Sequence, residues 1–206
     1  AEAHIAKTDS VLLLLTIVVY LTLFKYFKKT IDKTNLLDFF LFWICLGFSI
    51  LIKGPILLIL VSITIFLIIL IKKEIKWLYE TRPLMGIAIL LIISVPWFFL
   101  LPVEQQKNFL NQSLIHDFLG KIISEQENHG GYPGFYFFGL WIFLFPFSIF
   151  IVPLLHYLKK NYTNQNIFYL LVWIVPTILI MEFIPTKLPH YILPIFPAIS
   201  LGTAIM

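Results

Sequence analysis

Residues 36–71 read LLDFFLFWICLGFSILIKGPILLILVSITIFLIILI, two apolar runs separated only by Lys53-Gly54-Pro55. A single helix over both runs would be about 54 Å long at 1.5 Å per residue, whereas the hydrocarbon core of a bilayer is about 30 Å thick. Gly-Pro is a strong helix breaker, and a lysine at the middle of a bilayer costs about 2.5–3.5 kcal/mol or more. This stretch therefore predicts two antiparallel membrane-spanning helices, 36–52 and 56–71, with a tight turn at the membrane boundary.

The remainder of the chain repeats this pattern of apolar runs and short charged connectors. Of its 206 residues, 60% are hydrophobic and 13% are charged, about half the charged fraction of a soluble domain. The single cysteine excludes a disulfide framework or a zinc knuckle. We therefore predict an all-α fold, a polytopic transmembrane helix bundle of about seven spans. The predicted spans are 10–27, 36–52, 56–71, 84–101, 134–157, 167–184 and 192–206.

One long polar segment, 102–133, interrupts the apolar pattern. Ionisable groups in a membrane protein are expensive unless they face water, so we expect this segment to be a loop outside the hydrocarbon. It holds most of the side chains able to do chemistry: Glu104, His116, Asp117, Lys121, Glu125, Glu127 and His129.

The distribution of basic residues predicts the orientation of the chain. If the spans alternate, the connectors 25–33, 72–82 and 159–160 share one side and carry ten of the fifteen Lys and Arg residues. The positive-inside rule places that side in the cytoplasm. Asp9, Lys53 and the loop and turn at 102–133 and 187–191 are then all extracytoplasmic. Because the lysines flank apolar runs, the formal charge of +4 is a topology signal and no nucleic-acid partner is expected.

Each candidate residue also has a purely structural interpretation. Asp9 precedes a long apolar run and could be a helix N-cap, and Lys53 could be a boundary lysine that reaches toward water. Asp117 could cap a short amphipathic helix over 109–123 on the membrane surface. A bare turn, by contrast, does not require Lys187 and Tyr191 between prolines.

The loop 102–133 also contains side chains that could bind a metal. Glu125, Glu127 and His129 alternate in a way that suits a metal-binding turn, although a solvated loop gives this pattern by chance.

Four segments, in this order, carry a resemblance to a known family. They are AHIAKTD (3–9), KGP (53–55), HDF (116–118) with ENHGGYP (127–133), and KLPHYILP (187–194). Together they resemble the glycosyltransferases that use polyprenyl-phosphate sugars, which include the protein O-mannosyltransferases and the lipid A aminoarabinose transferase. The last segment is the most specific and is close to the pattern of the aminoarabinose transferase branch.

The resemblance implies a GT-C-like membrane domain with an extracytoplasmic active site in a bacterial inner membrane. Its partners would be a polyprenyl-phosphate-linked sugar donor, a lipid or protein acceptor, and membrane lipids. Asp9 matches the family's second acidic position, while Tyr191 and, more loosely, Lys121 match positions expected to hold the carrier phosphate. The resemblance also implies a divalent metal near the external loop, for which the candidate ligands are His116, Glu127 and His129. The family's presumed general base lies in an earlier external loop, upstream of Ala1. We therefore expect the chain to be an incomplete piece that does not turn over alone.

The chemistry of such a transfer fits the residues without the family name. Cations or phenol hydroxyls must stabilise the departing phosphate, and a carboxylate must deprotonate or orient the acceptor. Asp9 and Asp117 are the candidate catalytic residues. The candidate carrier-phosphate residues are Lys53, Lys121, Lys187 and Tyr191.

Two other interpretations remain open. A transporter or flippase would carry ionisable residues near the middle of its spans, where Glu182 and His156 are the candidates, both near span ends. A degraded gene fragment without activity is the second. The sugar and the acceptor, whether lipid A, another envelope glycan or a protein, cannot be read from the sequence.

Overall fold

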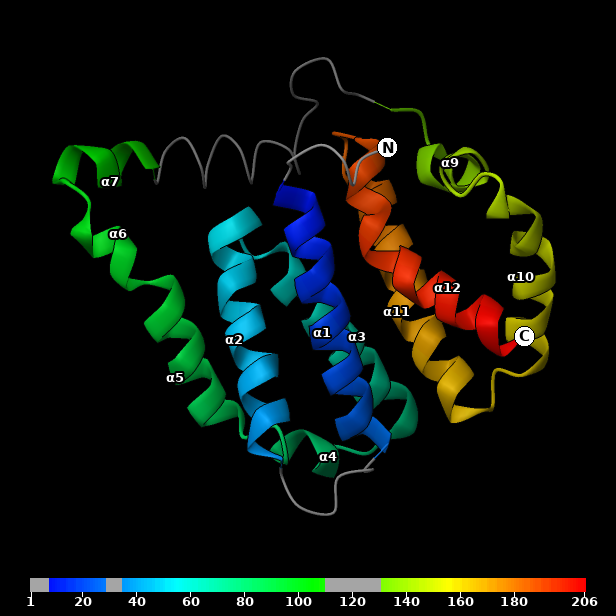
Figure 1. Ribbon diagram of the computed structural model, residues 1–206, viewed down its shortest axis with the longest axis horizontal. Helices are drawn as coiled ribbons and strands as arrows, with labels where there is room; N and C mark the ends of the chain where they lie inside the picture. Colours follow the sequence, from blue (N-terminus) through cyan, green and yellow to red (C-terminus); the bar gives the residue numbers. More distant parts are fainter. Residues whose placement is uncertain (1–7, 29–34, 110–130) are drawn as a thin grey trace. The chain divides into compact units, whose positions relative to one another are not determined.

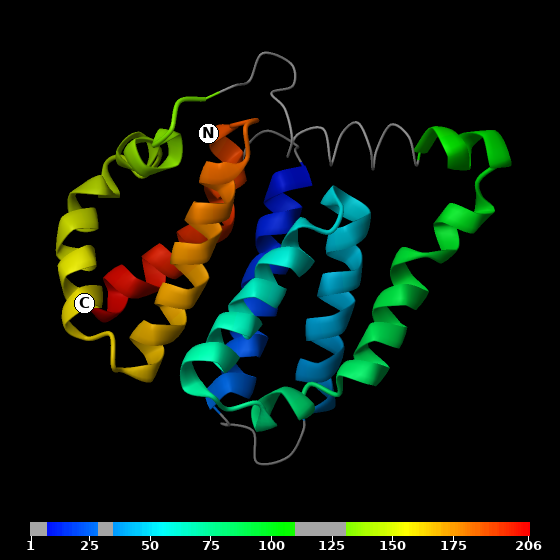
Figure 2. The ribbon, with the colours of Figure 1, turned by 180° about the vertical axis from the view of Figure 1, so that it is seen from behind.

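The computed structural model describes residues 8–28, 35–109 and 131–206. Within these residues the chain is helical and contains no β-strand, so the predicted all-α class is confirmed. The chain forms two compact units, Ala1–Gln106 and Lys107–Met206 (Figures 1 and 2).

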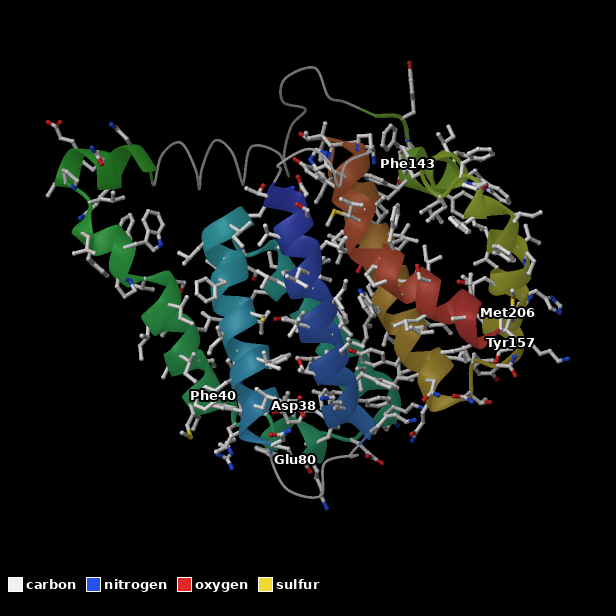
Figure 3. The ribbon with its side chains drawn as sticks, viewed as in Figure 1. Asp38, Phe40, Glu80, Phe143, Tyr157 and Met206 are labelled. Carbon is white, nitrogen blue, oxygen red and sulfur yellow. The ribbon has the colours of Figure 1, made fainter. Side chains whose placement is uncertain are left out.

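The first unit is built around a pair of long antiparallel helices. These are α1 (Thr8–Lys28) and α2 (Leu36–Lys53). The chain then returns through α3 (Ile56–Lys72), crosses one end of the unit in the short α4 (Lys76–Tyr79), and runs back through α5 and α6 to α7 (Figure 1). The bounds of the last three helices are Pro83–Ser94, Pro96–Leu100 and Val103–Phe109. Asp38 near the start of α2 and Glu80 after α4 mark the end of the unit opposite Lys53 (Figure 3).

The second unit is built mostly from short helices. Its longest helix is α11 (Gln165–Phe183), and α9 (Phe135–Phe143) lies near the C-terminal end of α11 (Figure 2). The remaining elements are η3 (Phe147–Phe150), α10 (Ile151–Lys160), η4 (Pro189–Ile195) and α12 (Phe196–Ile205). A cluster of Leu154, Leu158 and Ile167 joins α10 to α11.

Among the residues that the structure describes, four helical stretches are long and apolar enough to cross a membrane: α1, α2, α5 with α6, and α11. Two further apolar stretches, α3 and η4 with α12, are shorter. Many large hydrophobic side chains on these helices are exposed, as expected for surfaces that face lipid rather than water. The chain is therefore an integral membrane protein.

Four of the seven predicted runs correspond to single helices, and the other three are divided. The runs 10–27, 36–52, 56–71 and 167–184 become α1, α2, α3 and α11, each within two residues at either end. The run 84–101 is divided at Pro96 into α5 and α6, and the run 192–206 forms the end of η4 and α12. The run 134–157, however, is not one helix, because it forms α9, η3 and α10 with Pro146 between the first two. Proline has no N–H to donate and its ring clashes with the preceding turn, so hydropathy alone overestimated the length of this helix.

Close backbone approach fixes how α5 packs on α2. A Cβ atom on Gly86 would lie 1.8 Å from the indole ring of Trp43, so only glycine fits there. The Trp43 indole N–H donates to the Thr81 carbonyl oxygen at 2.7 Å and ties α2 to the segment that leads into α5. In the second unit, the Trp173 indole N–H donates to the Pro194 carbonyl oxygen at 3.0 Å and ties α11 to η4 in the same way.

Candidate functional site

An ion pair between Asp9 and Lys53 joins the start of α1 to the end of α2. Asp9 lies in the first turn of α1, where the helix dipole favours an anion, and Lys53 ends α2, where it favours a cation. The Lys53 ammonium donates to the Asp9 carboxylate, and their side chains are 26% and 11% exposed. The sequence placed both residues on one side of the membrane, and the structure brings them into contact.

The turn after α2 explains how Lys53 reaches this position. Gly54 has a positive φ of 68°, which glycine adopts without strain, and its N–H donates to the Ile50 carbonyl oxygen at 3.0 Å. The chain thus stops α2 at Lys53 and reverses into α3. The helices α2 and α3 thus lie on either side of the predicted turn.

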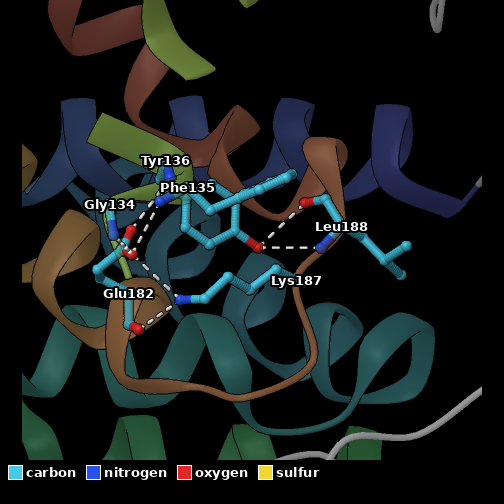
Figure 4. A network of polar contacts seen from close by, with 6 residues as sticks. All are labelled: Gly134, Phe135, Tyr136, Glu182, Lys187 and Leu188. Carbon is cyan, nitrogen blue, oxygen red and sulfur yellow. Dashed lines mark hydrogen bonds and ion pairs between the residues drawn. The ribbon is translucent and has the colours of Figure 1, made fainter. Parts of the chain in front are cut away.

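A second polar cluster lies in the other unit, around Glu182 near the end of α11 (Figure 4). One carboxylate oxygen of Glu182 accepts hydrogen bonds from the backbone N–H groups of Gly134 and Phe135, the latter at 3.0 Å. The other oxygen accepts from the N–H of Tyr136 at 3.1 Å. These N–H groups belong to the first turn of α9 and have no partner within that helix. Glu182 therefore caps α9 from a distant part of the chain.

Lys187 completes the charge balance of this cluster. Its ammonium lies 3.2 Å from a Glu182 carboxylate oxygen, and it also donates to the Glu182 carbonyl oxygen. It lies 5.5 Å from the centre of the Tyr136 ring. The Lys187 side chain is only 4% exposed, so its ammonium interacts with groups of the protein and not with the surroundings.

Tyr136 makes a second link between α9 and the turn that contains Lys187. Its hydroxyl donates to the Leu188 carbonyl oxygen and accepts from the Leu188 N–H, both at 3.1 Å (Figure 4). The Tyr136 side chain is fully buried. Two consecutive residues of the turn, Lys187 and Leu188, are thus held against the start of α9.

Tyr191 follows this turn in η4. Its N–H donates to the Leu188 carbonyl oxygen at 3.0 Å, and its ring meets the His190 ring edge to face at 5.0 Å between centres. Tyr191 is half-buried.

The other predicted site residues lie outside the described residues: His116, Asp117, Lys121, Glu127 and His129. Across residues 8–28, 35–109 and 131–206, no group of three or more His, Cys, Asp or Glu side chains could hold a metal ion.

Sequence reasoning missed the role of Glu182. The sequence alone identifies it only as a charge near the end of a span. Two signals pointed further: it is the only charged residue in the 19-residue α11, and a lysine follows five residues later. A lone acid in such a helix needs a cation or several N–H donors beside it.

The fold and these two ionic clusters define a helical membrane protein that keeps its charges at the ends of its helices. No family model matches the chain. In fold it is similar to ArnT from Cupriavidus metallidurans, whose crystal structure bound to undecaprenyl phosphate matches 99% of this chain with a TM-score of 0.86 at 19% identity. The apo structure of the same protein matches 98% of the chain with a TM-score of 0.78 at 22% identity. The chain thus has the fold of part of ArnT.

In sequence, the chain is 29% identical over 172 residues to an uncharacterized protein of Aquifex aeolicus (strain VF5). This match covers 80% of the chain but 32% of that protein, and the matches to ArnT cover 37% and 36% of the ArnT chain. The chain therefore spans about a third of the length of the proteins it resembles.

Proposed function

We propose that the protein containing this chain is an integral membrane glycosyltransferase that moves a sugar from a polyprenyl-phosphate carrier to an extracytoplasmic acceptor. The observation that carries the proposal is the turn Lys187–Tyr191. This segment has the most family-specific sequence of the chain, and a buried polar network holds it in place. The likeness in fold to ArnT, which was crystallised with undecaprenyl phosphate, supports the same conclusion.

The proposed reaction breaks the bond between the sugar and the carrier phosphate and forms a bond from the sugar to an acceptor hydroxyl. The hydroxyl proton passes to a carboxylate, and the carrier leaves as a polyprenyl phosphate whose negative charge has grown. A preorganised hydroxyl donor stabilises that charge, and we assign this role to Tyr191. Asp9 is the carboxylate that we assign to the acceptor, held in place by Lys53.

The other site assignments belong to the same proposal. For Lys187 the geometry favours support of the Tyr191 turn over direct contact with phosphate, because Glu182 already holds its ammonium. Asp117 and Lys121 are proposed for the acceptor and the carrier phosphate. A divalent metal is proposed at His116, Glu127 and His129. Lipid A, another envelope glycan or a protein is the proposed acceptor, and the inner membrane is the proposed location.

The test of this proposal is Tyr191→Phe in the gene product that contains this chain. The change removes the hydroxyl and keeps the ring, so the His190 contact and the helix packing should survive. Loss of one preorganised donor typically costs about 10²–10³ in rate, roughly 2.7–4 kcal/mol. The measurement is sugar transfer from a polyprenyl-phosphate donor in membranes, with Tyr162→Phe, an exposed tyrosine after α10, as the matched control. Full activity of Tyr191→Phe would show that the turn has only a structural role.

A transporter remains the rival candidate, and the position of the charges argues against it. A transporter needs ionisable groups near the middle of its spans. In the four candidate spans that the structure describes, every Asp, Glu and Lys lies within four residues of a helix end. Glu182, the transporter candidate from the sequence, instead caps α9.

A further inference from the structure

Glu182 stands at the crossing point of two segments that are far apart in the sequence. Its carboxylate accepts from three successive N–H groups, those of residues 134, 135 and 136. Gly134, the N-cap residue of α9, has no side chain to do this. An anion is favoured at this position, because the N–H groups of the first turn and the helix dipole both present positive charge.

The same carboxylate holds the Lys187 ammonium, which also binds the carbonyl oxygen of residue 182. Lys187 is tightly enclosed, since a Cβ atom on Gly131 would lie 2.5 Å from its Cδ atom. One carboxylate thus faces a helix N-terminus on one side and an ammonium on the other. If the carboxylate became neutral, the two positive groups would face each other without an anion between them.

Loss of the negative charge on Glu182 would affect Tyr191 through a series of hydrogen bonds. Tyr136, whose N–H is bound by Glu182, exchanges two hydrogen bonds with Leu188. The Leu188 carbonyl oxygen in turn accepts from the Tyr191 N–H. The position of Tyr191 relative to α9 therefore depends on a short chain of contacts that begins at Glu182.

We propose that Glu182 is a positioning residue for the carrier-phosphate site. It does not touch the phosphate, but it joins the Lys187–Tyr191 turn to the start of α9 and so fixes the backbone of Tyr191, the residue to which phosphate binding is assigned. This inference rests on the function proposed above. In this proposal Glu182 and Lys187 together position the turn, and neither of them binds the phosphate.

The experiment uses the full gene product in detergent, with undecaprenyl phosphate as the probe and native mass spectrometry as the binding measurement. Glu182→Gln keeps the size of the side chain and removes its charge. It should weaken binding about tenfold, because the turn must then be ordered when the ligand binds. Glu104→Gln, on the exposed glutamate of α7, is the matched control and should bind as the wild type does. Equal affinity of Glu182→Gln and wild type would overturn the proposal.

Hydrogen exchange gives a readout that does not need the ligand. The N–H groups of Leu188 and Tyr191 are both hydrogen-bonded in this network. In Glu182→Gln they should exchange faster than in wild type, while the amides of α2 stay unchanged. Unchanged exchange at Leu188 and Tyr191 would contradict the positioning role. If Glu182→Gln does not fold, Glu182→Asp replaces it, because the shorter acid keeps the charge but cannot reach both partners.

A double-mutant cycle tests whether Glu182 acts through Lys187. Lys187→Met removes the ammonium that Glu182→Gln leaves without an anion, so the double variant should lose less affinity than the two single losses combined. Additive losses would contradict the coupling. Failure of the proposed function is distinguishable, because wild type would then not bind undecaprenyl phosphate, or Tyr191→Phe would bind it equally well.

Discussion

Three lysines in the described residues pair with acids that lie elsewhere in the chain. Lys25 contacts Asp38 at 2.7 Å, Lys53 contacts Asp9, and Lys187 contacts Glu182 at 3.2 Å. In each pair the acid is more than three-quarters buried, and a buried carboxylate without a cation or N–H donors is costly. The pairs therefore hold charge at the ends of helices without exposing it to the hydrocarbon.

The Asp9 assignment leads to a prediction that separates chemistry from stability. Asp9→Asn should lower sugar transfer by the full gene product about 10²- to 10⁴-fold, the usual contribution of a general base. Its effect on stability should be small, because Lys53 is partly exposed and remains hydrated after its partner is lost. The measurements are the transfer rate and the melting temperature.

Asp38→Asn is the matched control for this experiment. Asp38 is also a buried acid near the start of a helix and is also paired with a lysine, but it lies at the opposite end of the same unit. It should leave the transfer rate close to that of wild type. A wild-type rate for Asp9→Asn, or an equal loss for both variants, would exclude Asp9 as the catalytic carboxylate.

Packing between helices depends on small residues at a few contact points. On α5, Gly86 lies against the Trp43 ring of α2, and on α2, Gly47 lies against Ile93 of α5. Because lipid is as apolar as the side chains, close packing rather than the hydrophobic effect holds such helices together. The contact at Gly86 is the tighter of the two, so added volume should matter most there.

Gly86→Ala should destabilise the protein by about 1–3 kcal/mol or more, the usual range for an overpacked contact. The added Cβ atom would lie 1.8 Å from the Trp43 ring, which cannot move without disturbing its hydrogen bond to Thr81. The check is the free energy of unfolding in mixed micelles. Gly47→Ala serves as the control, because its Cβ atom would lie 3.1 Å from Ile93 and needs only a small adjustment. An equal effect of the two substitutions would show that the Trp43 contact is not tight.

For the molecule as a whole, the basic residues predict one orientation in the membrane. In the first unit the ends of α1 and α3 and the starts of α2 and α5 lie together, opposite Lys53 and α7 (Figures 1 and 2). In the second unit Lys160 ends α10 at the end opposite the start of α9 (Figure 1). Alternation of the helices within each unit is what the positive-inside argument requires.

Cysteine labelling of intact cells tests the orientation. In a Cys45→Ala background, a cysteine at Glu104 should react with a membrane-impermeant reagent, and one at Lys160 should react only after the membrane is opened. Both positions are exposed, so accessibility within the protein does not limit the reaction. Labelling of Lys160→Cys but not Glu104→Cys in intact cells would reverse the orientation and move the proposed site to the cytoplasm.

The sequence by itself determined the class of this protein and the ends of four helices, α1, α2, α3 and α11. Both follow from local properties, namely the length of an apolar run against the thickness of a bilayer and the break at Gly54-Pro55. Pro146, which lies between α9 and η3, is also visible in the sequence. The single span predicted over 134–157 rested on hydropathy and did not take this proline into account.

Only the tertiary structure decided which charges meet. Asp9 and Lys53 are 44 residues apart, and Glu182 reaches Gly134 across 48 residues. A hydropathy pattern places such residues on the same side of a membrane but does not say which helix ends are neighbours, because that depends on how side chains such as Trp43 and Trp173 pack between helices. The role of Glu182 as the cap of α9 and the partner of Lys187 therefore became visible only in the fold.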